Sequence, residues 1–96
     1  MDYSRILNEL NSASLFELYR LNASIHQQLK DPIKLDLIKD VLMVGQVIKY
    51  FEAAENRLID AEILELKRTQ VLVKNIHNGE SWNIPYYFIN IDDSNI

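Results

Sequence analysis

Residues 70–84, QVLVKNIHNGESWNI, decide how the C-terminal half of this chain is interpreted. Gln70–Ile76 is rich in β-branched residues, and Glu80–Ile84 carries tryptophan and isoleucine, a composition typical of strands. Asn78-Gly79 stands between the two runs, and both residue types accept positive φ, which makes this pair the strongest short signal for a hairpin. The stretch therefore predicts two antiparallel strands that are joined at Asn78-Gly79.

Further strands are predicted on both sides of this hairpin. Val47–Phe51 and Phe88–Ile91 are dense in β-branched and aromatic residues. Pro85 would separate the hairpin from the last of these strands, because proline lacks the N–H that a ladder requires. With the segment discussed next, the chain would supply five strands.

The segment from Glu52 to Arg68 is ambiguous. Its alanines, leucines and glutamates favour a helix by intrinsic propensity. However, Ile59, Ala61 and Ile63 also alternate as a strand requires. We predict a strand over Leu58–Lys67, because the strands before and after it need a neighbour, and one continuous helix here would rule out a barrel.

The N-terminal region, residues 1–43, predicts two or three short helices. Ser14-Leu15-Phe16-Glu17 has the form of a capping box, in which a serine hydroxyl and a glutamate three residues later satisfy free backbone N–H groups. Asp31-Pro32 ends the helix that follows and suits the start of another. Helices of this length are marginal alone, so they need a partner.

The C-terminal half also resembles a known group of folds. The pattern comprises Val44-Gly45-Gln46-Val47, then residues 61–73, then Gly79-Glu80-Ser81-Trp82-Asn83-Ile84-Pro85-Tyr86. It resembles the small SH3-like barrels of the Tudor and KOW kind, which occur as accessory modules on bacterial proteins of unknown function. The resemblance covers residues 44–91 and implies a single-turn helix before the last strand. The predicted class is α+β, with helices in 1–43, a five-stranded SH3-like (Tudor-like) β-barrel in 44–92 and a polar tail in 93–96.

The resemblance also implies a binding groove. Tudor-like barrels can assemble aromatic residues into a cage for a methylated cation. The candidate groove residues are Tyr50, Phe51, Trp82 and Tyr86, with Glu52 or Glu55 as a counter-charge. The alternative is that these aromatics fill the core, since large aromatics dominate small cores.

Two other surfaces are candidates. KOW-like modules touch RNA through basic loops, and Lys67, Arg68 and Lys74 would be the contacts here; the alternative is a solvated strand edge. On the long predicted helix, apolar residues exceed what one packed stripe needs, which suggests a twofold dimer; the alternative is packing within one chain. That interface would comprise Leu15, Phe16, Leu18 and Tyr19.

Composition argues against several kinds of chemistry. The chain of 96 residues has no cysteine and only two glycines, so thiolate metal sites and a glycine-rich phosphate loop cannot form. His26 and His77 have no second histidine at ligand spacing, and the serines lack a nucleophile motif. We therefore expect no enzyme activity, no cofactor and no metal. The net charge of −4 disfavours duplex nucleic acid.

The sequence also indicates where the protein acts and what it does. It has no apolar run of the length that a membrane helix needs, and its lack of cysteine fits a reducing cytoplasm. We predict a cytoplasmic, non-catalytic protein-interaction module that serves as a dimeric adaptor or regulator. The alternatives are a nucleic-acid-associated accessory protein of a transcription or translation complex, and a small-molecule-binding regulator that uses a cleft between helices and barrel.

Overall fold

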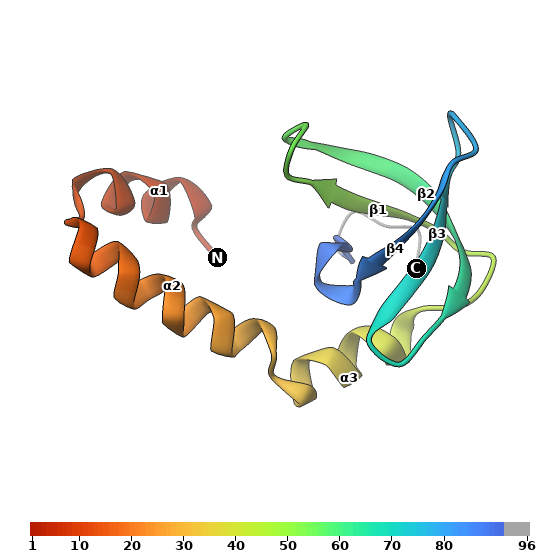
Figure 1. The fold of residues 1–96 in the computed structure, drawn as a ribbon, viewed down its shortest axis with the longest axis horizontal. Helices are drawn as coiled ribbons and strands as arrows, with labels where there is room; N and C mark the ends of the chain where they lie inside the picture. Colours follow the sequence, from red (N-terminus) through yellow and green to blue (C-terminus); the bar gives the residue numbers. More distant parts are fainter. Residues whose placement is uncertain (92–96) are drawn as a thin grey trace. The chain divides into compact units, whose positions relative to one another are not determined.

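The computed structural model describes residues 1–91 as three helices followed by a four-stranded sheet (Figure 1). The elements are α1 (Tyr3–Ser12), α2 (Leu15–Leu29), α3 (Pro32–Val41), β1 (Val47–Glu52), β2 (Arg57–Leu66), β3 (Gln70–Asn75), β4 (Ser81–Pro85) and the 3₁₀ helix η1 (Tyr86–Phe88). The chain divides into two compact units, residues 1–31 and a unit that begins at Pro32. The predicted polar tail, 93–96, lies outside the described residues.

The first unit consists of α1 and α2, and both begin at side-chain caps. The Asp2 carboxylate accepts a hydrogen bond from the Arg5 N–H at 3.1 Å. The predicted capping box is confirmed, because the Ser14 hydroxyl accepts from the Glu17 N–H at 3.1 Å and the Glu17 carboxylate accepts from the Ser14 N–H at 3.0 Å. Within residues 1–91, no helix combines the length and the apolar character needed to cross a bilayer.

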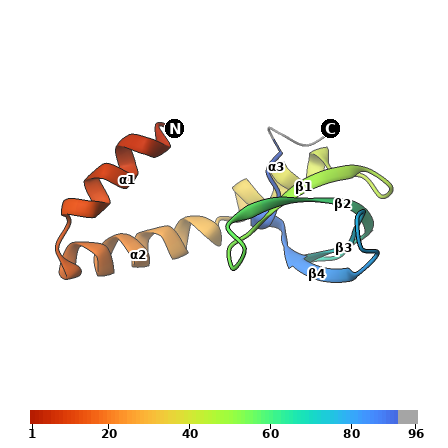
Figure 2. The same ribbon diagram turned by 90° about the horizontal axis from the view of Figure 1, so that it is seen from above.

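The second unit is built on an antiparallel meander with the strand order β1-β2-β3-β4. The ambiguous segment forms the strand β2, as predicted, and pairs with β1 on one side and β3 on the other. Its register shifts between Ile63 and Glu65, so β2 carries a bulge, a feature that bends a strand and increases its twist. Figure 2 shows the sheet curling, so that it has a concave face.

The core lies on this concave face and follows the alternation of the strands. The buried apolar residues of the sheet are Ile48, Tyr50, Ile59, Ala61, Ile63, Val71, Val73 and Ile84. Cross-strand pairs such as Ile63 with Val73 place them side by side. Tyr86 of η1, Ile89 and Leu42 complete the core, and Leu35 and Ile38 of α3 pack against it.

The prediction of a closed five-stranded barrel is wrong, although the α+β class is correct. The predicted last strand, Phe88–Ile91, does not form: the chain turns into η1 directly after Pro85. It then meets β1 through a single bridge between Tyr50 and Ile89 and a hydrogen bond from the Asn90 N–H to the Lys49 carbonyl at 2.9 Å. One bridge is too short to be a strand, and the sheet is therefore an open one of four strands.

The β3–β4 hairpin forms where predicted, but its turn differs from the two-residue turn that Asn-Gly favours. The Asn75 N–H donates to the Glu80 carbonyl at 2.8 Å, which leaves four residues in the loop. Gly79 has a φ of +74°, whereas Asn78 does not take a positive φ. The reason is the side chain of Asn75, whose oxygen accepts from the His77 N–H at 2.8 Å and replaces the tight turn by a wider, capped loop.

Candidate binding pocket on the concave face

The pocket of interest lies at the end of the concave face where the apolar core stops. Strand residues that are two positions apart point to the same face. Ile48 and Tyr50 are buried in the core, and the next residue on this face is Glu52. Arg57 precedes the buried Ile59 in the same way on β2. The alternation that makes the core therefore continues into polar residues at the ends of the strands.

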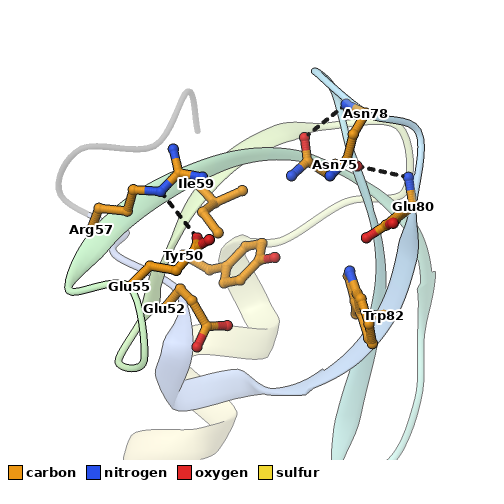
Figure 3. Close-up of a pocket in the computed structure, with 9 residues that line it drawn as sticks. All are labelled: Tyr50, Glu52, Glu55, Arg57, Ile59, Asn75, Asn78, Glu80 and Trp82. Carbon is orange, nitrogen blue, oxygen red and sulfur yellow. Dashed lines mark hydrogen bonds and ion pairs between the residues drawn. The ribbon is translucent and has the colours of Figure 1, made fainter.

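These inward-facing strand ends line a cavity of about 250 Å³, which we call the concave-face pocket. Its lining residues are Tyr50, Glu52, Glu55, Arg57, Ile59, Asn75, Asn78, Glu80 and Trp82 (Figure 3). Tyr50 is 3% exposed and forms an inner wall, while Trp82 is 53% exposed and forms an outer one. Figure 3 shows the Tyr50 hydroxyl pointing across the space toward Trp82.

The pocket carries an excess of negative charge. Three carboxylates, Glu52, Glu55 and Glu80, face one guanidinium, Arg57. Arg57 is engaged by Glu55, with its Nε 3.0 Å from a Glu55 carboxylate oxygen. The Glu52 carboxylate accepts a hydrogen bond from the Ala54 N–H at 3.1 Å, which holds it at the rim without neutralising it. The remaining charge of Glu52 and Glu80 favours a cation in the cavity.

The negative charge of the pocket contributes to a raised pKa of the Tyr50 hydroxyl. Its pKa is raised above the ordinary value mainly by burial and further by the negative charges of Glu52 and Glu55. Arg57 opposes the effect but does not cancel it. The phenol therefore stays protonated at neutral pH, so its oxygen is a neutral hydrogen-bond donor and acceptor rather than a base.

A second, smaller cavity adjoins the first. It measures about 220 Å³ and shares Tyr50, Glu52 and Trp82 with the concave-face pocket. Its other lining residues are Asn83, Ile84 and Phe88, so this side is more apolar. Together, the two cavities offer a charged compartment beside a compartment for an apolar group.

The predicted groove residues are only partly brought together. Tyr50 and Trp82 line the pocket on opposite sides. Phe51 follows Tyr50 on β1 and therefore points to the other face, where it is half-exposed. Tyr86 is buried in the core, and its hydroxyl donates to the Lys67 carbonyl. The structure therefore places two of the four residues at the pocket.

Several lining residues were missed from the sequence. Arg57, Asn75, Asn78 and Glu80 come from hairpin ends, which have no motif of their own. Three of them, Arg57, Asn75 and Glu80, could have been identified by continuing the alternation of inward-facing residues on each strand past its last apolar residue. Applied to β3, for example, the sequence Val71, Val73 continues to Asn75, the one buried polar side chain among the described residues.

The predicted nucleic-acid residues do not form one patch. Lys67 and Arg68 lie in the β2–β3 turn, and the Lys67 ammonium donates to the Asn83 side chain at 2.9 Å. Lys74 lies near the opposite end of β3, opposite Glu62 of β2 and Ser81 of β4. Phosphate binding gains from several neighbouring cations, which this separation does not provide.

The predicted dimer residues lie on α2, and three of the four are strongly exposed. Leu15 is 86%, Phe16 68% and Tyr19 71% exposed, whereas Leu18 is partly buried. The Arg20 guanidinium lies 6.0 Å from the centre of the Phe16 ring, a cation–π distance.

The histidines and carboxylates of the described part do not assemble a metal site. Across residues 1–91, no group of three or more potential ligands comes together. The His77 ring instead lies 3.4 Å from the Asp60 carboxylate. That histidine and the nearby Lys49 lower the pKa of Asp60 below its ordinary value. These contacts lie on the surface and outside the pocket.

Comparisons with known proteins do not add a family to this description. No protein-family model matches the chain, and neither the curated proteins nor the solved structures that were compared with it give a match.

Proposed function

We propose that the protein is a non-catalytic protein-interaction module whose concave-face pocket takes a positively charged side chain from a partner protein. The observation that supports this most is the meeting of three carboxylates with Tyr50 and Trp82 at the open end of the concave face. A lysine or arginine head group would be attracted to Glu52 and Glu80 and could rest against the indole of Trp82 through a cation–π contact.

The size of the cavity favours one side chain over a larger ligand. Pockets for small molecules and cofactors usually measure about 300–1,000 Å³, whereas the concave-face pocket has about 250 Å³. The adjoining cavity at Ile84 and Phe88 would accept an apolar group next to the cation. The apolar stem of a lysine or arginine, or a neighbouring apolar residue of the partner, suits this compartment.

The other predicted functions receive less support. A nucleic-acid role would need Lys67, Arg68 and Lys74 to act together, and they lie at different ends of β3. For a small-molecule regulator, the concave-face pocket is smaller than the sites that usually bind such ligands. The cytoplasmic location stays a prediction from the lack of cysteine.

The proposal is tested by the fluorescence of Trp82, which is the single tryptophan of the chain and a wall of the pocket. The probes are short peptides with one central lysine or arginine, and the control peptide has norleucine in its place. We expect the cationic peptides to change the emission at low salt, with weaker binding at high salt because exposed charges are screened. The norleucine peptide should have no effect.

Variants separate this pocket from the general acidity of the protein. Glu80→Gln and Glu52→Gln should each weaken binding several-fold. Glu62→Gln removes the same charge from the other face of β2, where Glu62 lies opposite Lys74, and should leave binding unchanged. Absence of any response to cationic peptides at low salt, or an equal loss with Glu62→Gln, would refute the proposal.

A further inference from the structure

The N-terminal unit, residues 1–31, lacks a core of its own. Neither α1 nor α2 contains a buried residue. Tyr3, Phe16 and Tyr19 each expose about two thirds of their surface. A chain of fewer than about 40 residues is not expected to fold without additional support, and short helices depend on packing for their stability. The apolar faces of α1 and α2 therefore require an occupant.

The two helices leave a gap between them instead of packing against each other. They form a V, as Figures 1 and 2 both show. The gap measures about 770 Å³. Its apolar lining includes Tyr3, Ile6, Leu7, Leu10, Leu21 and Ile25. A volume of this size has room for several apolar side chains from another helix.

The pattern of apolar residues differs between the two helices. At about 100° per residue, the apolar residues of α1 fall on one face. On α2, Leu21 and Ile25 face the gap, whereas Phe16 and Tyr19 fall on the roughly opposite side of the helix. The helix α1 therefore has one surface to cover, and α2 has two.

We propose that a second copy of this chain fills the gap, with α2 of each copy lying between α1 and α2 of the other. In this four-helix arrangement, each α2 contacts the other α2 through Leu21 and Ile25 and the other copy's α1 through Phe16 and Tyr19. Each α1 needs only one apolar face. A twofold axis satisfies both contacts at once, because a twofold interface is reciprocal.

The available area and charge agree with a second copy. Since an aromatic side chain can bury 150–250 Å², Tyr3, Phe16 and Tyr19 together offer roughly 400 Å². The aliphatic residues of the two helices add a similar area, which gives roughly 800 Å² per copy, the amount found in standard interfaces. Residues 1–31 carry four acidic and three basic groups, so two copies do not repel each other strongly.

The test begins with the oligomeric state of the full chain. Sedimentation velocity over a wide range of protein concentration should show a dimer that dissociates on dilution. Phe16→Lys and Ile25→Lys each place a charge in one of the two contacts and should weaken dimerisation more than about tenfold. Ser24→Lys, on the polar side of α2, is the matched control and should dimerise normally. Trp82 fluorescence verifies that the sheet unit remains folded in each variant.

Cysteine cross-linking tests the interlocked arrangement, and the natural chain has no cysteine to interfere. A mixture of Leu7→Cys and Ala23→Cys chains should form a mixed disulfide under mild oxidation, because α1 of one copy would face the Phe16–Tyr19 side of α2 in the other. A monomer at every concentration would overturn the proposal and assign the apolar faces to the sheet unit or to a different protein. A dimer that tolerates both lysine variants, or one that fails to form the mixed disulfide, would also overturn it.

Discussion

The Tyr86 hydroxyl donates a hydrogen bond to the backbone carbonyl of Lys67, which ties η1 to the β2–β3 turn. Lys39 of α3 strengthens the same corner: its ammonium donates to the Arg68 carbonyl and lies 5.2 Å from the centre of the Tyr86 ring. Tyr86 is therefore a structural residue that joins three elements, although the sequence suggested a place in the binding groove.

Removal of this hydroxyl should destabilise the sheet unit without affecting the pocket. Tyr86→Phe loses one partly buried hydrogen bond and leaves the Lys67 carbonyl without that donor, which should lower the free energy of unfolding by about 1 kcal/mol. Urea denaturation followed by Trp82 fluorescence measures the change. Tyr87→Phe is the matched control, because Tyr87 is half-exposed; an equal loss in both variants would contradict the role given to Tyr86.

The capping box of α2 should make helix content depend on acid pH. The hydrogen bonds with Ser14 lower the pKa of Glu17 below its ordinary value of 4.5. Because the folded-state pKa is depressed, the stabilisation is present above pH 4.5 and is lost as the pH falls through the lowered folded value. Circular dichroism at acid pH should therefore show a loss of helix that is smaller in Glu17→Gln. Glutamine keeps a capping oxygen but does not titrate, so identical acid profiles would contradict the prediction.

Alkaline pH should weaken the sheet unit through its two buried tyrosines. Burial raises the pKa of Tyr50, and Glu52 and Glu55 raise it further; burial also raises the pKa of Tyr86. A raised folded-state pKa means that the stabilisation is complete below the ordinary value of 10.0 and is lost as the pH rises through the folded value. Tyr50→Phe should flatten this alkaline decline in stability, as measured by urea midpoints, and Tyr87→Phe should not. A decline that is unchanged by Tyr50→Phe would disprove this assignment.

Gly79 should be needed for its backbone conformation alone. Its φ of +74° is unfavourable for other residues, while a Cβ there would meet nothing closer than the Lys74 side chain at 4.0 Å. Gly79→Ala should therefore cost about 1–2 kcal/mol of stability. Asn56, with a φ of +51°, provides the reverse test: Asn56→Gly should be neutral or stabilising. A neutral Gly79→Ala in thermal denaturation would show that the loop adopts another conformation.

Much of the fold was predictable from local signals. The capping box at Ser14 predicted where α2 begins. The alternation of Ile59, Ala61 and Ile63 predicted the strand β2, although the composition of this segment favours a helix. That alternation succeeded because β2 is an inner strand, and its pairing with a strand on each side outweighs its helical propensity. That the sheet stays open was not predictable, because closure depends on how far the residues after Pro85 continue along β1, and strand composition does not determine that length.

The pocket was predictable only in part. Tyr50 and Trp82 were identified as aromatic residues of the C-terminal half. Aromatic content alone did not distinguish Tyr50, which faces the pocket, from Phe51, which points to the other face of the sheet. Glu80 was missed although it continues the inward-facing alternation of Trp82 and Ile84, because a charged residue at the end of a strand looks like an ordinary solvent-exposed residue in the sequence. The binding residues at hairpin ends are therefore the least predictable ones.

The order of the strands has a consequence for how the sheet unit forms. Because β1, β2, β3 and β4 each pair with their neighbour in sequence, every hairpin can assemble from residues that are close along the chain. Only small loop-closure entropies are involved, which favours rapid folding. The bridge from Ile89 to Tyr50 spans the whole meander and should form last. During synthesis on the ribosome, the hairpins would thus form before the segment around Ile89 emerges and pairs with β1.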